Sequence, residues 1–162
     1  MADEIERKFL VTVLPDSVEL GPGEELRQGY LAIDGAVEVR IRISGGAARL
    51  TIKAGSGLSR TEVEVPLAPT DADDLWEHTA GRRIEKVRHR VALAPGIDAD
   101  VDRYRAGLSG LCTAEVEFAD LESARAFPPP RWFGREVTGE PGWSNAALAR
   151  HGIPAAGGDQ QD

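Results

Sequence analysis

The amino-acid sequence predicts a mainly β protein of the α+β class: an eight-stranded antiparallel sheet closed into a barrel, with a few flanking helices. Two observations favour this fold. Apolar and polar residues alternate along eight short segments, as expected for strands with two different faces. Tight-turn sequences such as Asp34-Gly35, Gly45-Gly46 and Pro95-Gly96 join these segments. Eight strands in such a meander are enough to close a barrel.

The expected strands follow one another along most of the chain. The alternation is cleanest in the third, where four apolar residues face away from three charged ones. A glycine-rich turn at Gly55-Ser56-Gly57 leads into the fifth strand. The predicted ranges are Glu4–Val13, Leu26–Ile33, Val37–Ser44, Arg49–Lys53, Leu58–Leu67, Arg82–Leu93, Ile97–Tyr104 and a last strand around Ala114–Phe118.

Three helices are expected between and after the strands. The first is predicted to be capped by Thr70 and stopped by Gly81. A short helix over Leu121–Phe127 is cut by three consecutive prolines. Ser144 is expected to cap a final helix that ends near Arg150.

Composition limits the class of partner and the compartment. The chain has 162 residues, 41% of them hydrophobic, and a net charge of −8, which argues against nucleic acid or an anionic membrane as partner. A local cluster of basic residues could still bind a small polyanion. A single cysteine, Cys112, and no apolar signal segment predict a cytoplasmic protein. Residues 155–162 are expected to form a disordered tail.

Charges of one sign gather strand by strand. Two arrangements fit this pattern: the charged faces coat the outside of the barrel, or they line its interior and bind metal and phosphate. The pattern alone leaves both open. The acidic pairs are Glu4/Glu6, Glu62/Glu64, Asp100/Asp102 and Glu115/Glu117, and the basic pairs are Arg40/Arg42 and Lys86/Arg88.

The segment Glu4-Ile5-Glu6-Arg7-Lys8 resembles the ExExK signature of the CYTH domain, the triphosphate tunnel metalloenzymes. The resemblance spans about Ala2 to Pro154, which gives a predicted single domain over residues 1–154, and it is strongest to short bacterial inorganic triphosphatases. It implies a closed eight-stranded tunnel whose acids and bases point inward. The other matching positions are Arg40-Ile41-Arg42, Lys53, Glu62-Val63-Glu64, Lys86, Arg88, Asp102 and Glu115-Val116-Glu117.

The resemblance also implies a role for each matching residue. The expected triphosphate ligands are Lys8, Arg40, Arg42, Lys53, Lys86 and Arg88. A first Mg²⁺ would be held by Glu4, Glu6 and Glu117. A second would be held by Glu64, Asp102 and Glu115, with Glu62 as a further candidate, and Mn²⁺ is the alternative metal. The expected catalytic residues are Glu64, Asp102, Glu115 and Lys86.

The implied activity is metal-dependent hydrolysis of tripolyphosphate to pyrophosphate and phosphate, by a monomer or homodimer. Two alternatives stay open: a class IV adenylate cyclase, thiamine-triphosphatase or nucleoside triphosphatase of the same fold, and a non-catalytic module that binds polyphosphate or nucleotide. The three histidines are too scattered for a metal site. Arg49 has the parity of the tunnel-facing residues but could equally form a surface ion pair at a tunnel mouth, and the role of Tyr30 stays open. Trp132 and Phe133 are expected to cover the barrel.

Overall fold

The computed structural model describes residues 5–54 and 61–155. Glu4, the turn at Gly55-Ser56-Gly57, the start of the fifth predicted strand and all of the predicted tail after Ala155 lie outside the described residues. The strands are β1 (Ile5–Leu10), β2 (Gly23–Asp34), β3 (Val37–Ser44), β4 (Ala47–Ala54), β5 (Thr61–Leu67), β6 (Arg83–Ala94), β7 (Ile97–Tyr104) and β8 (Cys112–Phe118). The helices are α1 (Pro69–Glu77), α2 (Leu121–Ala126) and α3 (Asn145–His151), with 3₁₀ turns η1 (Ala106–Leu108) and η2 (Pro141–Trp143).

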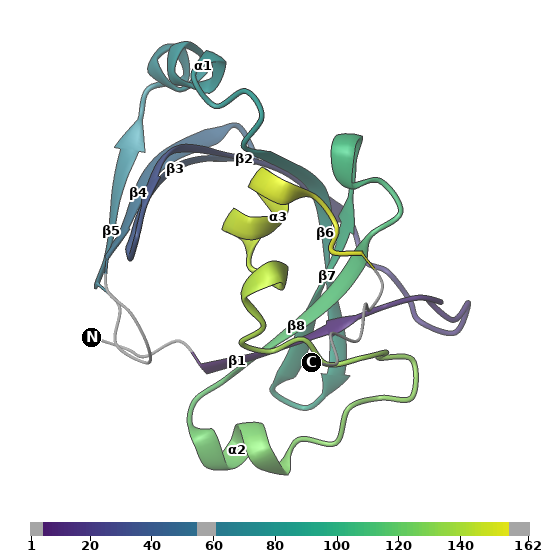
Figure 1. The fold of residues 1–162 in the computed structure, drawn as a ribbon. Coiled ribbons are helices and arrows are strands. Elements are labelled where there is room, and N and C mark those ends of the chain that lie inside the picture. Colours follow the sequence, from purple (N-terminus) through teal and green to yellow (C-terminus); the bar gives the residue numbers. More distant parts are fainter. Residues whose placement is uncertain (1–4, 55–60, 156–162) are drawn as a thin grey trace.

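The eight strands form one antiparallel sheet in the order β1-β8-β7-β6-β2-β3-β4-β5. Figure 1 shows the sheet bent into an arc, with β5 and β1 at its two ends. Most neighbours are consecutive hairpin strands. The exceptions are the β2/β6 and β1/β8 ladders, which join segments far apart in the sequence.

The sheet is not closed, so the prediction of a closed barrel is wrong. Among the described strands, β8 is the only one that pairs with β1, and β4 the only one that pairs with β5. Every residue of β5 from Thr61 to Pro66 is exposed. Pro66 has no backbone N–H to donate, which is typical of an edge strand.

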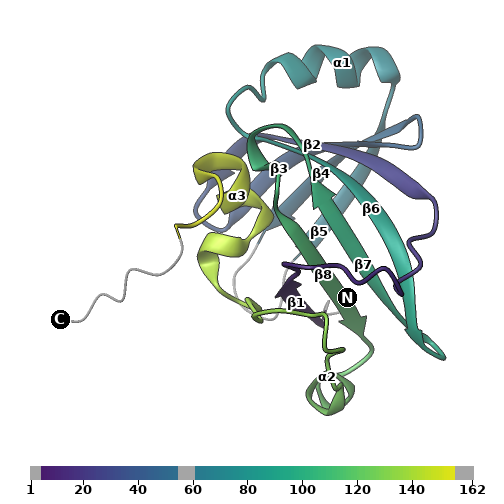
Figure 2. The ribbon, with the colours of Figure 1, turned by 90° about the vertical axis from the view of Figure 1, so that its right-hand side faces the viewer.

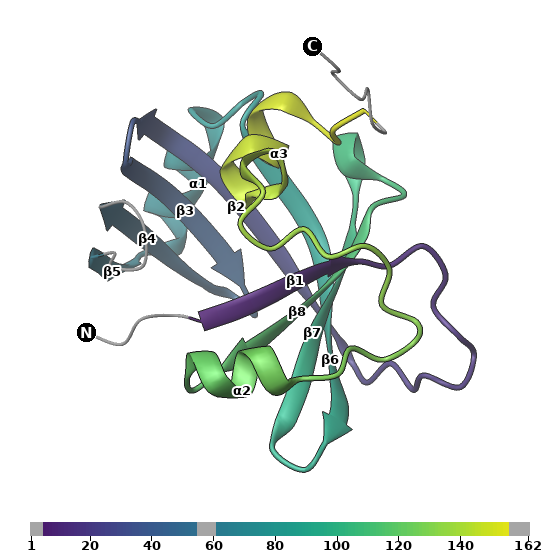
Figure 3. The same cartoon turned by 60° about the horizontal axis from the view of Figure 1, so that its bottom comes forward.

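The outer edge of β1 is occupied by a different part of the chain, which is the physical reason that β5 does not pair with it. The amide of Leu10 donates to the carbonyl of Arg135 (2.9 Å), and the amide of Val137 donates to the carbonyl of Lys8 (2.8 Å). Gly134 donates to the Leu10 carbonyl at 2.7 Å. Figure 3 shows this segment passing β1 between α2 and α3. A strand edge covered in this way is protected from pairing with another strand.

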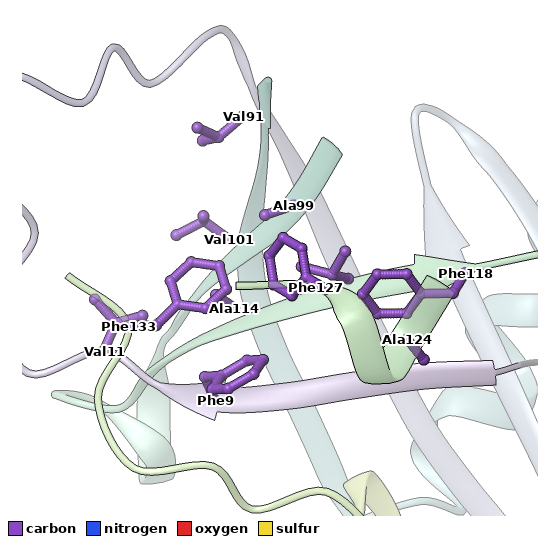
Figure 4. Close-up of a cluster of buried hydrophobic side chains, with 11 residues drawn as sticks. Phe9, Val11, Val91, Ala99, Val101, Ala114, Phe118, Ala124, Phe127 and Phe133 are labelled. Carbon is purple, nitrogen blue, oxygen red and sulfur yellow. The ribbon is translucent and has the colours of Figure 1, made fainter. Parts of the chain in front are cut away.

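Helices α1 and α2 cover the outer, convex side of the sheet (Figure 1). Ala72 of α1 packs on Ile41 and Ala48 of β3 and β4. Between α2 and the sheet lies a larger apolar cluster that includes Phe9, Phe118, Phe127 and Phe133 (Figure 4). The Phe9 and Phe133 rings are 4.8 Å apart between centroids. Phe9 and Phe118 thus face outward, and Phe133 covers the sheet as predicted.

Helix α3 lies on the concave side, against the middle strands β6 and β2 (Figures 1 and 2). Its Leu148 is 1% exposed and joins a cluster with Ile84 of β6 and Tyr104 of β7. Ile84 is two residues from Lys86 on β6, and Tyr104 is two residues from Asp102 on β7. Both therefore share a face of the sheet with these charged residues. Along β6 and β7 the concave face therefore changes from charged to apolar, and α3 covers the apolar part.

The helix ends were only partly predictable. Ser144 caps α3, since its Oγ accepts from the Ala147 amide at 3.1 Å, which confirms that prediction. The predicted cap at Thr70 is wrong. The cap residue of α1 is Ala68, followed by Pro69, and its side chain makes no capping hydrogen bond. In the described part of the chain, no helix is long and apolar enough to cross a membrane.

Candidate active site

The strand registers place the described site residues on one face of the sheet. Residues directly opposite in an antiparallel ladder share a face, so the pairs can be followed from strand to strand. Lys8 opposes Glu115, Asp102 opposes Arg88, and Arg40 opposes Thr51. The apolar clusters under α1 and α2 lie on the convex side, so this charged face is the concave one. It brings together Glu6, Lys8, Arg40, Arg42, Lys53, Glu62, Glu64, Lys86, Arg88, Asp102, Glu115 and Glu117.

Asp102 is the most deeply buried charge on the concave face, with 0% exposure. The Nε of Arg88 donates to its Oδ1 at 2.7 Å, and the Nη2 of Arg88 donates to its Oδ2 at 2.7 Å. The Nζ of Lys86 lies 2.5 Å from the same Oδ2. A buried carboxylate needs such partners, because its hydration is lost.

Burial and these contacts together lower the pKa of both Asp102 and Lys86. Burial alone would raise the pKa of Asp102, but the hydrogen bonds from Arg88 and the positive charge of Lys86 outweigh it and lower that pKa. Burial lowers the pKa of Lys86, because the neutral amine is easier to desolvate than the ammonium, and Asp102 offsets only part of this effect.

Glu115 stands between two basic side chains. Its Oε1 lies 2.9 Å from the Nζ of Lys8, and its Oε2 lies 3.5 Å from the Nη2 of Arg88. Burial raises the pKa of Glu115, but the nearby charges of Lys8 and Lys86 lower it overall. Asp100, which lies directly opposite Glu115, accepts from the Nη1 of Arg88 at 2.8 Å.

At the other end of the sheet, the acids of β5 pair with bases of β4. The Nζ of Lys53 lies 2.9 Å from the Oε2 of Glu62. Arg49 donates to Glu64 at 3.1 Å, and Thr51 donates to the same carboxylate at 3.3 Å. Acids on one strand therefore face bases on the next. This cross-strand pairing offsets the repulsion that segregated charges would otherwise cause.

A buried arginine, Arg40, and a half-buried one, Arg42, lie between these groups. Arg40 is 5% exposed, and its Nε has no hydrogen-bond partner within the described residues. Arg42 donates to Gln28, with nitrogen–oxygen distances of 3.3 and 3.4 Å. Burial, followed by the positive charges of Arg40 and Arg88, lowers the pKa of Arg42. This crowding of cations favours an anionic ligand.

The predicted metal ligands are only partly brought together. Glu6 and Glu117 are directly opposite on β1 and β8, and Glu4 lies outside the described residues. Asp102 and Glu115 share Arg88 as a partner, whereas Glu62 and Glu64 pair with β4. In the part of the chain that the structure describes, no three His, Cys, Asp or Glu side chains form a ready metal site.

Four polar residues of the concave face had no role in the sequence prediction. Gln28 donates from Nε2 to the hydroxyl of Tyr30 at 2.8 Å, and Tyr30 is 0% exposed. The ring of Tyr104 faces the Nζ of Lys86 at 5.4 Å, and burial strongly raises the pKa of its hydroxyl. Asp100 binds Arg88. Strand alternation could have identified these residues, because each lies an even number of positions along its strand from a residue already predicted to face the site or opposite one in the sheet.

Comparison with known proteins identifies the family. The CYTH domain model matches residues 2–136. The chain belongs to the CYTH family. The CYTH chain is 44% identical over 147 residues to an inorganic triphosphatase of Nitrosomonas europaea, a match that covers 90% of this chain and 96% of the relative. It is 36% identical over 154 residues to an inorganic triphosphatase of Acetivibrio thermocellus, covering 93% and 96%. The predicted similarity to short bacterial inorganic triphosphatases is therefore confirmed.

A solved structure supports the fold of this CYTH chain. The crystal structure of an inorganic triphosphatase has a TM-score of 0.75 and 41% identity, and the match covers 96% of this chain and 99% of that one. A putative adenylate cyclase from Bacillus halodurans has a TM-score of 0.56 at 16% identity, covering 77% and 86%, which shows a shared fold alone. CYTH triphosphatases are metal-dependent in general. The carboxylates of the concave face are hard oxygen ligands, the chemistry that a divalent cation of this kind requires.

Proposed function

We propose that the chain is a metal-dependent inorganic triphosphatase that hydrolyses tripolyphosphate to pyrophosphate and phosphate. The observation that carries this proposal is the unpartnered, buried Nε of Arg40 on a concave face rich in cations. Buried N–H groups are nearly always hydrogen-bonded. A phosphate oxygen would satisfy this donor with a short, charge-assisted bond. The two triphosphatase relatives support the same reading.

The proposed substrate ligands reach across most of the sheet. Lys8 lies on β1, Lys86 and Arg88 on β6, Arg40 and Arg42 on β3, and Lys53 on β4. Arg42 stands directly opposite Arg49 across the β3/β4 ladder. Like charges at such positions destabilise a sheet, and a phosphoryl group between them would remove that cost. We assign Arg49 to the same anion-binding row.

Carboxylates on the other strands would hold the metal. We propose Mg²⁺, with Mn²⁺ as the alternative, in two positions: one near Glu4, Glu6 and Glu117, and one near Asp102, Glu115, Glu64 and Glu62. The like-charged pair Glu6–Glu117 across β1/β8 supports the first position. When bound, such an ion neutralises phosphate charge and lowers the pKa of a bound water.

The protein side chains then provide positioning and electrostatic stabilisation, which make up most of the catalysis of phosphoryl transfer. Lys86 is 5% exposed and held between Asp102 and the Tyr104 ring, so its ammonium has a fixed place on the floor of the site. We propose that it binds an oxygen of the transferred phosphoryl group. Helix α3 covers the adjacent part of the concave face and limits the access of bulk water there.

We infer the substrate preference from the tyrosines of the concave face, neither of which offers a stacking surface. The two tyrosines of the concave face, Tyr30 and Tyr104, are 0% and 5% exposed, so neither ring can take up a base. A nucleoside or thiamine group would add bulk without a compensating contact. We therefore propose a preference for inorganic tripolyphosphate over ATP and thiamine triphosphate.

Three further proposals concern the whole chain. We propose that residues 1–154 form one domain, and the predicted tail after Ala155 lies outside the described residues. The single cysteine, Cys112, fits a cytoplasmic location. The protein acts as a monomer or homodimer on a small polyanion, without nucleic acid or membrane as partner.

One assay panel tests the function. Phosphate release is measured with tripolyphosphate, pyrophosphate, ATP and thiamine triphosphate, each with Mg²⁺, with Mn²⁺ and with a chelator. We expect rapid release from tripolyphosphate that the chelator abolishes, and a kcat/KM at least 100-fold lower for ATP. Comparable values for ATP would contradict the proposed specificity. Release that persists in chelator would contradict metal dependence.

A further inference from the structure

The carboxylate oxygens of Asp102 and Glu115 are all occupied by nitrogen atoms of the protein. Arg88 reaches Oδ1 and Oδ2 of Asp102 and Oε2 of Glu115, Lys86 reaches Oδ2, and Lys8 reaches Oε1. These two acids are the ones proposed to hold a metal ion. A divalent cation that binds these acids therefore competes with the protein cations for the same carboxylate charge.

Arg88 is the cation best able to leave. Its side chain is 25% exposed, against 5% for Lys86 and 9% for Lys8. It also bridges three acids, because its Nη1 lies 2.8 Å from Asp100. Lys86, by contrast, is held against the Tyr104 ring. The guanidinium of Arg88 therefore fills the acidic cluster in place of an ion.

We propose that Arg88 is an internal competitor for the metal: it occupies the Asp100, Asp102 and Glu115 cluster in the unliganded protein and moves to the triphosphate when the metal binds. This inference rests on the proposed function, because it assumes that both ligands bind here. It adds a coupling between them. Arg88 released from the acids gains phosphate oxygens as new partners, so each ligand strengthens binding of the other.

The first measurement uses Mn²⁺ alone, followed by calorimetry and by the electron paramagnetic resonance signal of free Mn²⁺. Arg88→Gln frees the acids from competition, and we expect it to bind Mn²⁺ at least 10-fold more tightly than the wild type. A residue with a purely structural role would weaken Mn²⁺ binding when replaced. This arm needs no hydrolysis, so it stands or falls separately from the triphosphatase activity.

The control is Arg42→Gln. Arg42 shares the concave face and contributes the same charge, but it donates to Gln28 rather than to an acid. We expect less than a threefold change in Mn²⁺ affinity. If Mn²⁺ bound equally more tightly to both variants, the loss of any positive charge would explain the effect, and the proposal would be overturned. Unchanged or weaker Mn²⁺ binding by Arg88→Gln would also overturn it.

The second measurement tests the coupling with imidotriphosphate, a non-hydrolysable triphosphate. In the wild type we expect it to increase the affinity for Mn²⁺ at least 10-fold, and Mn²⁺ to increase its affinity by the same factor. Arg88→Gln should lose most of this coupling. If Arg88→Gln does not fold, Arg88→Lys keeps the charge and loses the fork, and should show tighter Mn²⁺ binding with reduced coupling. Full coupling in a folded Arg88 variant would overturn the proposal.

Discussion

Lys8 and Glu115 are directly opposite on β1 and β8, with the Nζ of Lys8 2.9 Å from the Oε1 of Glu115. One is a proposed ligand of the substrate and the other a proposed ligand of the metal. Each neutralises the other in the unliganded protein. The same contact therefore stabilises the fold and lies at the centre of the site, and its replacement should affect both properties.

Lys8→Met should lower stability and activity together. Glu115 is only 14% exposed and would keep Arg88, at 3.5 Å, and the nearby charge of Lys86. Loss of one member of a buried ion pair costs about 3–5 kcal/mol, and we expect a loss toward the lower end of that range because Arg88 remains. Urea unfolding and the kcat/KM for tripolyphosphate measure the two effects. Arg90→Gln, on an exposed arginine paired with Asp98, is the control. Wild-type stability in Lys8→Met would contradict the interpretation.

Asp102→Asn should abolish turnover and change the pH dependence of stability. The folded-state pKa of Asp102 is lowered, so its ionisation stabilises the fold above the unfolded-state value of about 3.9 and this stability is lost as pH falls through the lower folded-state pKa. The wild type should lose more unfolding free energy than Asp102→Asn below about pH 4. Denaturant unfolding between pH 6 and 3 measures this. Parallel pH curves for the two proteins would show that Asp102 has no such role.

Arg40→Gln should weaken substrate binding with little change in stability. The Nε of Arg40 has no partner to lose within the described residues, and Glu62 is 4.0 Å from its Nη2. A lost charge-assisted hydrogen bond is about 1.5–3 kcal/mol, or roughly 10- to 150-fold in affinity. Calorimetry with imidotriphosphate tests it, with Arg105→Gln as a matched surface control. An unchanged affinity would remove Arg40 from the anion site.

Gly134→Ala should destabilise the cover of the β1 edge. A Cβ at this position would lie 2.7 Å from the Leu10 carbonyl oxygen, which is backbone and can move only with β1. We expect a melting temperature several degrees lower, with faster amide exchange at Leu10 and Val137. Gly142→Ala is the control, since its Cβ would meet only a proline side chain at 3.4 Å. Equal melting of both variants would show that the contact adapts freely.

The sequence was sufficient to predict the eight strands and which side chains share a face, whereas the resemblance to the CYTH domain was needed to expect the charged face inside. Alternation in Val37–Ser44 and Ile97–Tyr104 matches the observed strands residue for residue. Closure was not predictable, because it depends on what occupies the outer edge of β1. The segment around Gly134 does so through backbone groups, which leave no pattern in the side chains. The ion pairs between acids and bases were not predicted either. From the sequence, the acids were assigned to metal and the bases to phosphate, whereas in the structure they pair across strands, as Lys53 does with Glu62.

The open sheet also has a mechanical consequence. It consists of two arms, β2 to β5 and β6 to β8 with β1, and the only ladder that joins the described arms is β2/β6. That ladder can act as a hinge. A polyanion that contacts Lys8 on one arm and Lys53 on the other would draw the two arms together. The free energy of substrate binding would then also determine the curvature of the sheet.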